Sequence, residues 1–172
     1  MGGCCGGGDP RTVRVEFEYL VVDGDTCDRC GDTRQSVRAA VDDAAGPLSR
    51  AGVTLEFAER HLDADQLANS NRVLVNGRAA ESWLGGTEVM TECASCSDLV
   101  GADVCCREIE IGGVRTAAID RDVIFDAIMA AAGLGTEGVP GSACGGDSAA
   151  PSSTTAGDVP VRVTLVTGPG CG

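Results

Sequence analysis

The sequence predicts a mixed α/β domain over about residues 11–134, and three segments near its start carry this prediction. Residues 13–22 alternate polar and apolar side chains and end fully apolar, which is typical of a strand that becomes buried. In residues 37–48 apolar side chains recur every three or four positions, which indicates an amphipathic helix that Pro47 is expected to bend or end. Residues 53–57 are expected to form a second strand, parallel to the first, because strands joined by one helix form a right-handed βαβ unit.

Antiparallel strands are predicted next. Residues 63–68 are expected to form a short helical turn. Residues 72–75 and 78–83 are then expected to pair as a hairpin around Asn76 and Gly77, because Asn-Gly favours the two-residue turn between antiparallel strands.

A cysteine-rich insertion, residues 84–118, is expected to separate this hairpin from the last helix. It contains four cysteines and a second hairpin, in which residues 108–111 and 114–118 pair around two glycines. Asp120 is then expected to cap a helix whose apolar side chains share one face of residues 123–131.

The segments outside this domain have low complexity. Residues 1–10 are predicted to be a flexible glycine-rich tail, in which Cys4 and Cys5 are either a metal-handling pair or an accident of composition. Residues 135–172 begin as a linker of Gly, Ser, Ala, Thr and Pro. Within them, residues 159–166 alternate like a strand, and they either join a sheet edge or stay disordered.

Charge excludes two classes of partner. The 172 residues carry 26 acidic and 13 basic side chains, all of the basic ones arginine, for a net charge of −13. Phosphate groups would be repelled, so neither nucleic acid nor an anionic membrane surface is an expected partner. No apolar run approaches the roughly 18 residues of a membrane helix, and no basic segment precedes an apolar run at the start, so a cytoplasmic protein is expected. The acidic, lysine-free composition indicates a salt-adapted, halophilic cytoplasm or, alternatively, a GC-rich genome.

Cysteine usage is the most informative part of the composition. Without an export signal the ten cysteines are expected to be mostly reduced, which favours metal or thiol chemistry over a disulfide scaffold. Packing cysteines would be scattered singly. Here eight of them form close pairs: Cys4 and Cys5, Cys27 and Cys30, Cys93 and Cys96, Cys105 and Cys106.

The pair Cys27 and Cys30 has the spacing and the position of a redox motif. It ends the first predicted strand and opens the first predicted helix. Free N–H groups and the positive potential of a helix N-terminus stabilise a thiolate, so Cys27 is expected to be the nucleophile and Cys30 the thiol that resolves a mixed disulfide. Arg29 should favour the thiolate, whereas Asp28 and Asp32 should oppose it.

The predicted order, β-α-β-β-β-α with Cys-x-x-Cys after the first strand, resembles the minimal thioredoxin/glutaredoxin architecture. More narrowly, over about residues 12–133 the chain is similar to a cysteine-rich thioredoxin-like family catalogued as a domain of unknown function. The motifs that carry this resemblance are Cys27-Asp28-Arg29-Cys30, Val73-Leu74-Val75-Asn76-Gly77, Cys93-Ala94-Ser95-Cys96 and Cys106-Arg107. The resemblance implies Cys27 as attacking thiol and Cys30 as resolving thiol. It also implies a cis-proline before the third strand, where this chain has Asn71 and a trans peptide is expected.

Topology predicts where the insertion begins. If the first strand points towards Cys27, the fourth strand ends at the same rim of the sheet, and the insertion leaves from that rim. The four cysteines of the insertion are therefore expected near Cys27 and Cys30.

Three functions stay open for these cysteines. The first is thiol-disulfide exchange by Cys27 and Cys30, an oxidoreductase activity on a thiol or disulfide client protein or a small thiol. The second is a structural zinc ion, the cofactor that the spacing indicates, although an adjacent cysteine pair is awkward for donating two ligands. Its ligands would be Cys93, Cys96, Cys105 and Cys106. The third is binding of a soft metal or metalloid (zinc, arsenic, mercury) by both clusters without turnover. Otherwise the cysteines only staple the insertion.

Overall fold

The computed structural model describes residues 11–135 and 162–166. The elements along the chain are β1 (Arg11–Leu20), α1 (Asp28–Arg50), β2 (Val53–Leu62), the 3-10 helix η1 (Ala64–Asn69), β3 (Arg72–Val75), β4 (Arg78–Ala79), α2 (Ala80–Trp83), β5 (Thr87–Glu92), α3 (Ala94–Val100), β6 (Cys105–Ile111), β7 (Val114–Thr116), α4 (Arg121–Ala131) and β8 (Arg162–Val166). The tail at residues 1–10 and most of residues 135–172 lie outside the described residues, as do Cys4, Cys5, Cys144 and Cys171.

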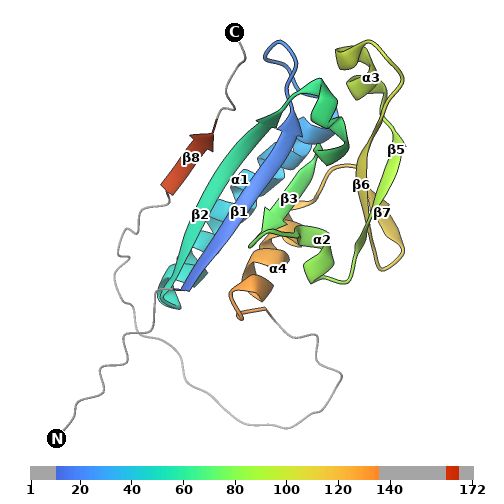
Figure 1. The fold of residues 1–172 in the computed structure, drawn as a ribbon. Coiled ribbons are helices and arrows are strands. Elements are labelled where there is room, and N and C mark those ends of the chain that lie inside the picture. The colour runs from blue at the N-terminus through green and yellow to red at the C-terminus, as the bar shows by residue number, and fades with distance from the viewer. Residues whose placement is uncertain (1–10, 136–161, 167–172) are drawn as a thin grey trace, which may run out of the picture.

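Strands of the described residues form a five-stranded sheet in the order β4-β3-β1-β2-β8 and a three-stranded sheet in the order β5-β6-β7 (Figure 1). β1 pairs in parallel with β2, and β3 runs antiparallel to β1. The βαβ unit and the antiparallel third strand predicted from the sequence are therefore confirmed, and the fold is mixed α/β.

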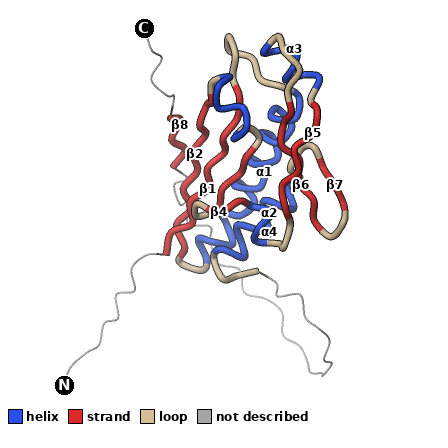
Figure 2. Tube along the Cα trace, turned by 45° about the vertical axis from the view of Figure 1, so that its right-hand side comes forward, coloured by secondary structure: helices blue, strands red, loops and turns tan. Residues whose placement is uncertain are grey.

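The core lies where α1 and α4 pack against each other and against the large sheet. Alternate side chains of β1, such as Val15 and Phe17, are fully buried there, together with Val37 and Val41 on one face of α1. The small sheet contacts η1 and α2, on the side of the large sheet that carries β3 and β4 (Figure 2). Among the described helices none combines the length and the apolar character needed to cross a membrane.

Of the bend or end expected at Pro47, an early end is not found, because Pro47 lies in the last turn of α1, where it removes only one intrahelical bond, while Leu48 beside it is fully buried. One expected boundary is wrong. Residues 78–83 do not form one strand, because β4 ends at Ala79 and a helical turn follows. That turn buries Glu81, which forms an ion pair with Arg107 of the insertion.

Both predicted hairpin turns are present. Asn76 and Gly77 have φ values of 52° and 76°, as the two-residue turn requires, and Gly112 and Gly113 lie between β6 and β7. Of the alternatives for the C-terminal segment, the structure supports the added strand, since β8 pairs in parallel with β2 at the sheet edge. β5 and α3 of the insertion were not predicted.

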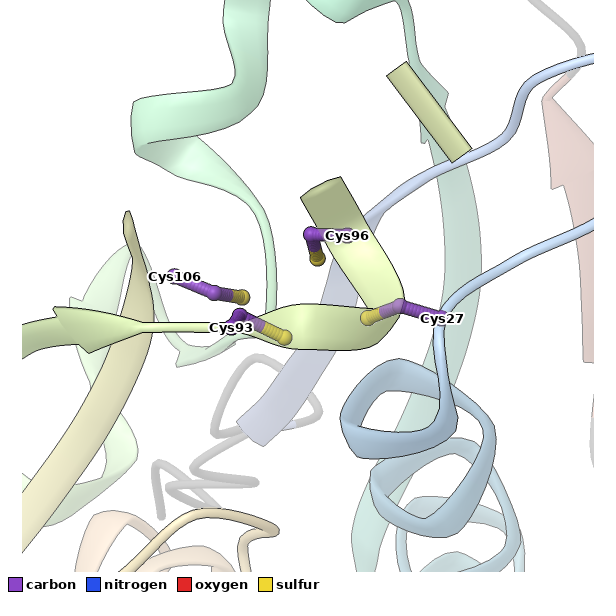
Figure 3. A group of neighbouring side chains, drawn as sticks. All are labelled: Cys27, Cys93, Cys96 and Cys106. Carbon is purple, nitrogen blue, oxygen red and sulfur yellow. The ribbon is translucent and has the colours of Figure 1, made fainter. Parts of the chain in front are cut away.

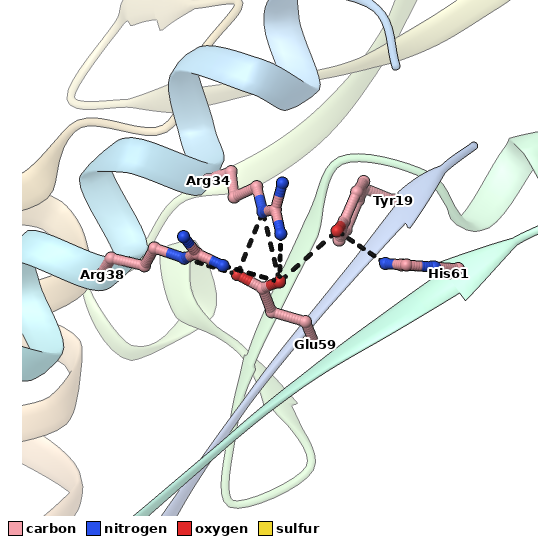
Figure 4. A network of polar contacts seen from close by, with 5 residues as sticks. All are labelled: Tyr19, Arg34, Arg38, Glu59 and His61. Atoms are coloured by element: carbon pink, nitrogen blue, oxygen red, sulfur yellow. Dashed lines mark hydrogen bonds and ion pairs between the residues drawn. The ribbon is translucent and has the colours of Figure 1, made fainter. Parts of the chain in front are cut away.

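A buried carboxylate, Glu59 on β2, ties α1 to the sheet (Figure 4). Its side chain is 1% exposed and accepts hydrogen bonds from Arg34 and Arg38 of α1, at 2.8 Å from each. The hydroxyl of Tyr19 lies 3.4 Å from Glu59 and 2.7 Å from Nε2 of His61. Burial acts to raise the pKa of Glu59, but the hydrogen bonds and charges of the two arginines outweigh it, so this pKa is lowered.

We expect Glu59→Gln to lower the free energy of unfolding at pH 7 by about 1–3 kcal/mol, because charge-assisted hydrogen bonds at a buried site are lost while the half-exposed arginines regain water. The folded-state pKa is lowered, so the carboxylate stabilises the fold above its ordinary value of 4.5, and this stability is lost as pH falls through the lower folded value. The effect of the substitution should therefore shrink below about pH 4.

Urea unfolding at pH 7 and pH 3.5 measures this effect. Glu56→Gln is the matched control, since Glu56 pairs with Arg14 at the surface, where the side chains are 42% and 61% exposed, and a change below about 1 kcal/mol is expected. Equal losses for the two variants, or a loss for Glu59→Gln that does not depend on pH, would contradict the assigned role.

Candidate metal centre

Four buried cysteine sulfurs converge at one end of α1 (Figure 3). The Sγ atoms of Cys27, Cys93, Cys96 and Cys106 all lie within 4.8 Å of one another. The four residues are 1%, 3%, 0% and 0% exposed. All six cysteines within the described residues are free, so the group consists of thiols rather than disulfides. The expectation that the insertion cysteines approach the first pair is thus met for three of the four.

Three separate segments deliver these sulfurs. Cys27 is the N-cap of α1, at the point where β1 has ended and the chain turns into the helix. Cys93 immediately precedes α3 and Cys96 lies in its first turn, where the N–H of Ser97 donates to the carbonyl of Cys93 at 2.9 Å. Cys106 lies on β6 and pairs with Thr91 of β5. The centre therefore exists only when the small sheet is docked against the large one.

Cys105 does not take part, although the zinc set expected from the sequence was Cys93, Cys96, Cys105 and Cys106. Neighbouring residues on a strand point to opposite faces, so burying Cys106 leaves Cys105 exposed. The structure places Cys27 of the first pair in the group instead. The adjacent cysteine pair thus supplies one sulfur to the group and not two.

Cys30 is a fifth buried cysteine beside the group of four. Its backbone N–H donates to Sγ of Cys27 at 3.5 Å, which is the N-capping bond of α1. Its own Sγ lies 3.2 Å from Oγ of Ser70, and that hydroxyl oxygen accepts the N–H of Leu20 at 2.9 Å. Ser70 therefore joins Cys30 to the end of β1, a contact that sequence reasoning did not identify.

Hydrogen bonds among the thiols favour one ionised sulfur, Cys27. The pKa of Cys27 is lowered well below its ordinary value, because it accepts hydrogen bonds from the thiols of Cys106, Cys30 and Cys96 and from the N–H of Cys30. The pKa of Cys30 is raised by its hydrogen bonds with Cys106 and Cys27 and by burial. The pKa of Cys106 is raised chiefly by its bond to Cys27. These contacts favour the thiolate form of Cys27.

Arg29 connects the first cysteine segment to the second and third. Its guanidinium donates to Oγ1 of Thr91 at 2.9 Å, to the carbonyl of Glu92 at 2.8 Å and to the carbonyl of Cys106 at 3.4 Å. It also pairs with Glu108 at 3.2 Å. The sequence suggested that Arg29 would act on a thiolate; in the structure its donors contact the backbone beside Cys106 and immediately before Cys93. Arg29 therefore holds the sulfur-bearing segments at their separation.

Asn71 also attaches the insertion to the large sheet. It is fully buried, has a left-handed backbone with φ of 57°, and donates from its amide to the carbonyls of Arg107 at 3.1 Å and Ala117 at 2.9 Å. The trans peptide expected here is found, since the described residues contain no cis peptide bond. The available sequence signal for this role was weak: asparagine tolerates positive φ better than most residues.

The arrangement offers a metal four sulfur ligands and no carboxylate or imidazole. His61, the only histidine of the chain, contacts Tyr19 and does not belong to the cysteine group. Four buried thiols from three segments can bind one ion and, in doing so, cross-link the two sheets. Cys27 and Cys30, one helical turn apart, can alternatively exchange a disulfide.

Comparison with known proteins gives a family but no activity. Residues 13–128 match the family described as a domain of unknown function, DUF2703. The chain is 31% identical over 116 residues to a protein of Archaeoglobus fulgidus described as an uncharacterized protein, and the alignment covers 65% of this chain and 82% of that one. No solved structure matches the chain. On both sequence matches, this chain belongs to the DUF2703 family.

Proposed function

We propose that the protein binds one soft metal ion, zinc in the first instance, through Cys27, Cys93, Cys96 and Cys106. The observation that carries the proposal is the convergence of four buried sulfurs from three segments to within 4.8 Å of one another. Cysteines buried only for packing need not bring their sulfur atoms together. Their convergence supports a binding site rather than simple core packing.

The geometry fits a tetrahedral thiolate site. Zinc–sulfur bonds of about 2.3 Å place the sulfurs of a regular tetrahedron about 3.8 Å apart. The sulfurs here lie within 4.8 Å, so small side-chain rotations would close the site around an ion. An all-thiolate donor set selects zinc, copper(I) or heavier soft ions and metalloids over magnesium or calcium.

A site with four protein ligands favours holding the metal over catalysis at it. Catalytic zinc sites keep one position for water or substrate, whereas structural sites are filled by the protein. Here the protein supplies all four ligands, and the four cysteines are 3% exposed or less. We therefore propose binding without turnover, with stabilisation of the docked insertion as its structural consequence.

Local charge supports the thiolate form. A metal needs deprotonated cysteines, so binding releases protons. The lowered pKa of Cys27 reduces the free-energy cost of removing the proton from this thiol. Cys27 is the N-cap of α1, so the positive end of the helix offsets part of the negative charge of the thiolates.

Native mass spectrometry of the full chain, purified under reducing conditions and supplied with zinc, tests the proposal. We expect one zinc per chain, and we expect cobalt(II) bound in its place to give the intense near-ultraviolet absorption of thiolate-to-cobalt charge transfer. Magnesium, which prefers oxygen ligands, is the negative control. Failure to retain zinc in this experiment would overturn the proposed function.

Thiol-disulfide exchange by Cys27 and Cys30 is a second candidate function, favoured by one further observation. Cys27 caps α1, has a lowered pKa and is hydrogen-bonded to Cys30 one turn later, an arrangement that suits attack on a disulfide and its resolution. The strand order β4-β3-β1-β2, with this motif after β1, supports a thioredoxin-like fold. The client would be a small disulfide or a protein disulfide in a reducing compartment such as the cytoplasm.

Alkylation kinetics of the metal-free protein measure this second function. Iodoacetamide at pH 7 should label Cys27 faster than Cys105, even though Cys105 is exposed and Cys27 is 1% exposed, because the thiolate is the reactive form. Peptide mapping of the label at early times identifies the faster site. Preferential labelling of Cys105 would argue against an activated Cys27.

A further inference from the structure

Cys30 is the buried thiol at the centre that metal binding leaves unused. We propose that it makes metal retention dependent on redox state: oxidation joins Cys27 to Cys30 in a disulfide, removes one of the four ligands and releases the ion. This regulation depends on the metal centre proposed above and extends it, because it assigns the fifth sulfur a role that a simple four-cysteine site does not need.

The contacts of Cys30 favour pairing with Cys27. The two residues are three apart at the start of α1, where such side chains are neighbours on the helix surface. The N–H of Cys30 already donates to Sγ of Cys27 at 3.5 Å. Besides Oγ of Ser70 at 3.2 Å, the polar groups that interact with the thiol of Cys30 are the thiols of Cys106 and Cys27. A disulfide here needs side-chain rotation within one helical turn and no movement of a domain.

The pair Cys27 and Cys30 differs from the other Cys-x-x-Cys pair in how many of its sulfurs would bind the metal. Cys93 and Cys96 both belong to the group of four, so each would be bound to the metal. Cys27 has a partner outside that group, and this partner stays a free thiol while the ion is bound. The resolving step can therefore proceed without first detaching a second ligand.

The oxidant in this scheme is a low-molecular-weight disulfide, RSSR. The thiolate of Cys27 detaches from the ion and attacks one sulfur of RSSR, so that a bond between Cys27 and that sulfur forms, the S–S bond of RSSR breaks and one thiolate, RS⁻, leaves. Cys30 then loses its proton and attacks the sulfur of Cys27, and the second RS⁻ leaves and takes that proton. The cysteine pair gives up two electrons and RSSR gains them. The metal is left with Cys93, Cys96 and Cys106.

A small oxidant would reach Cys27 by way of the exposed turn before it. Cys27 itself is 1% exposed, but the turn that precedes it contains Asp23, Gly24 and Asp25, all of which are exposed. This turn is closed by a single pair of backbone hydrogen bonds between Val22 and Asp25. Small disulfides should therefore react faster than protein disulfides.

Zinc release from the loaded full chain tests the proposal. The protein is treated with bis(2-hydroxyethyl) disulfide, released zinc is followed with a chromogenic chelator, and disulfides are located by peptide mapping. Wild type should release its zinc as a Cys27–Cys30 disulfide forms. Cys30→Ser should bind one zinc but release it at least about tenfold more slowly, because without the resolving thiol the mixed disulfide on Cys27 is reversed when the released thiolate attacks it. Cys105→Ser, which removes the exposed thiol outside the group, should release zinc at the wild-type rate.

The outcomes separate the two proposals. A wild-type chain that retains no zinc overturns the metal centre itself. If wild type binds one zinc but Cys30→Ser releases its zinc just as fast, only the redox role is overturned. Release accompanied by a disulfide between other cysteines also overturns only the redox role. Should Cys30→Ser fail to fold, Cys30→Ala replaces it, and the mapped disulfide of wild type remains a decisive measurement.

Discussion

Cys106→Ser is expected to lower the affinity for zinc more than about 100-fold, because even loss of a partner outside the ligand shell typically costs 10–100-fold. Cys105→Ser, one position earlier, should leave the affinity within about twofold, because its side chain is exposed and outside the sulfur group. The two variants remove the same atom from neighbouring residues of β6. Their difference therefore measures the geometry of the site and not the number of cysteines.

Competition with a chelator of known affinity gives the dissociation constants of the two variants. Circular dichroism of the metal-free forms checks that both fold to the same extent as wild type. Equal loss of affinity in Cys105→Ser and Cys106→Ser would contradict the ligand set. Loss in Cys105→Ser alone would contradict it too, whereas loss in both variants would fit the set Cys93, Cys96, Cys105 and Cys106 expected from spacing.

Arg29→Ala is expected to lower zinc affinity about 10–100-fold, the usual effect of removing a group that orients metal ligands. The guanidinium contacts the carbonyls of Glu92 and Cys106, and its loss frees the segments that bear Cys93 and Cys106 from α1. On binding, the ion would then have to order three segments that are no longer held together, and that ordering costs conformational entropy.

Arg29→Lys and Arg14→Ala make the measurement specific. Lysine keeps the charge but lacks the fork of donors that reaches several oxygens at once, so Arg29→Lys should recover only part of the affinity. Arg14 is 61% exposed, pairs with Glu56 at the surface, and should leave the affinity unchanged when replaced. Hydrogen exchange of β5 and β6 in the metal-free Arg29→Ala variant should also be faster than in wild type. Full affinity in Arg29→Ala, with unchanged exchange, would contradict a positioning role.

The site at the start of α1 could be predicted because its signals are local. The alternation in residues 13–22 indicates where β1 ends, and the apolar stripe of residues 37–48 indicates a helix behind it. Cys27 therefore had to lie near a helix N-terminus, and the structure has it as the N-cap. Hydrogen bonds between residues three or four apart enforce such a relation without reference to the rest of the chain.

The choice between Cys105 and Cys106 could not be made in this way. The two are identical neighbours, and which one is buried depends on the face that β6 turns to α1, and so on its pairing with β5. β5 has no strong strand signal, because its side chains are mostly exposed and two of its six residues are glutamate. Residues 80–83 were expected to be a strand for a related reason: a distant contact is involved in their helical turn. That turn places Glu81 against Arg107, a residue 26 positions away.

Local sequence thus determines the βαβ core, the two glycine turns and the placement of one cysteine pair at a helix start, because periodicity and turn chemistry act over a few residues. The membership of the sulfur group, the clamp by Arg29 and the anchoring by Asn71 depend on how the small sheet docks on the large one. Those contacts join residues 36–77 positions apart. Their geometry emerges only when the whole core packs, because no pattern within a short segment encodes the register between distant ones.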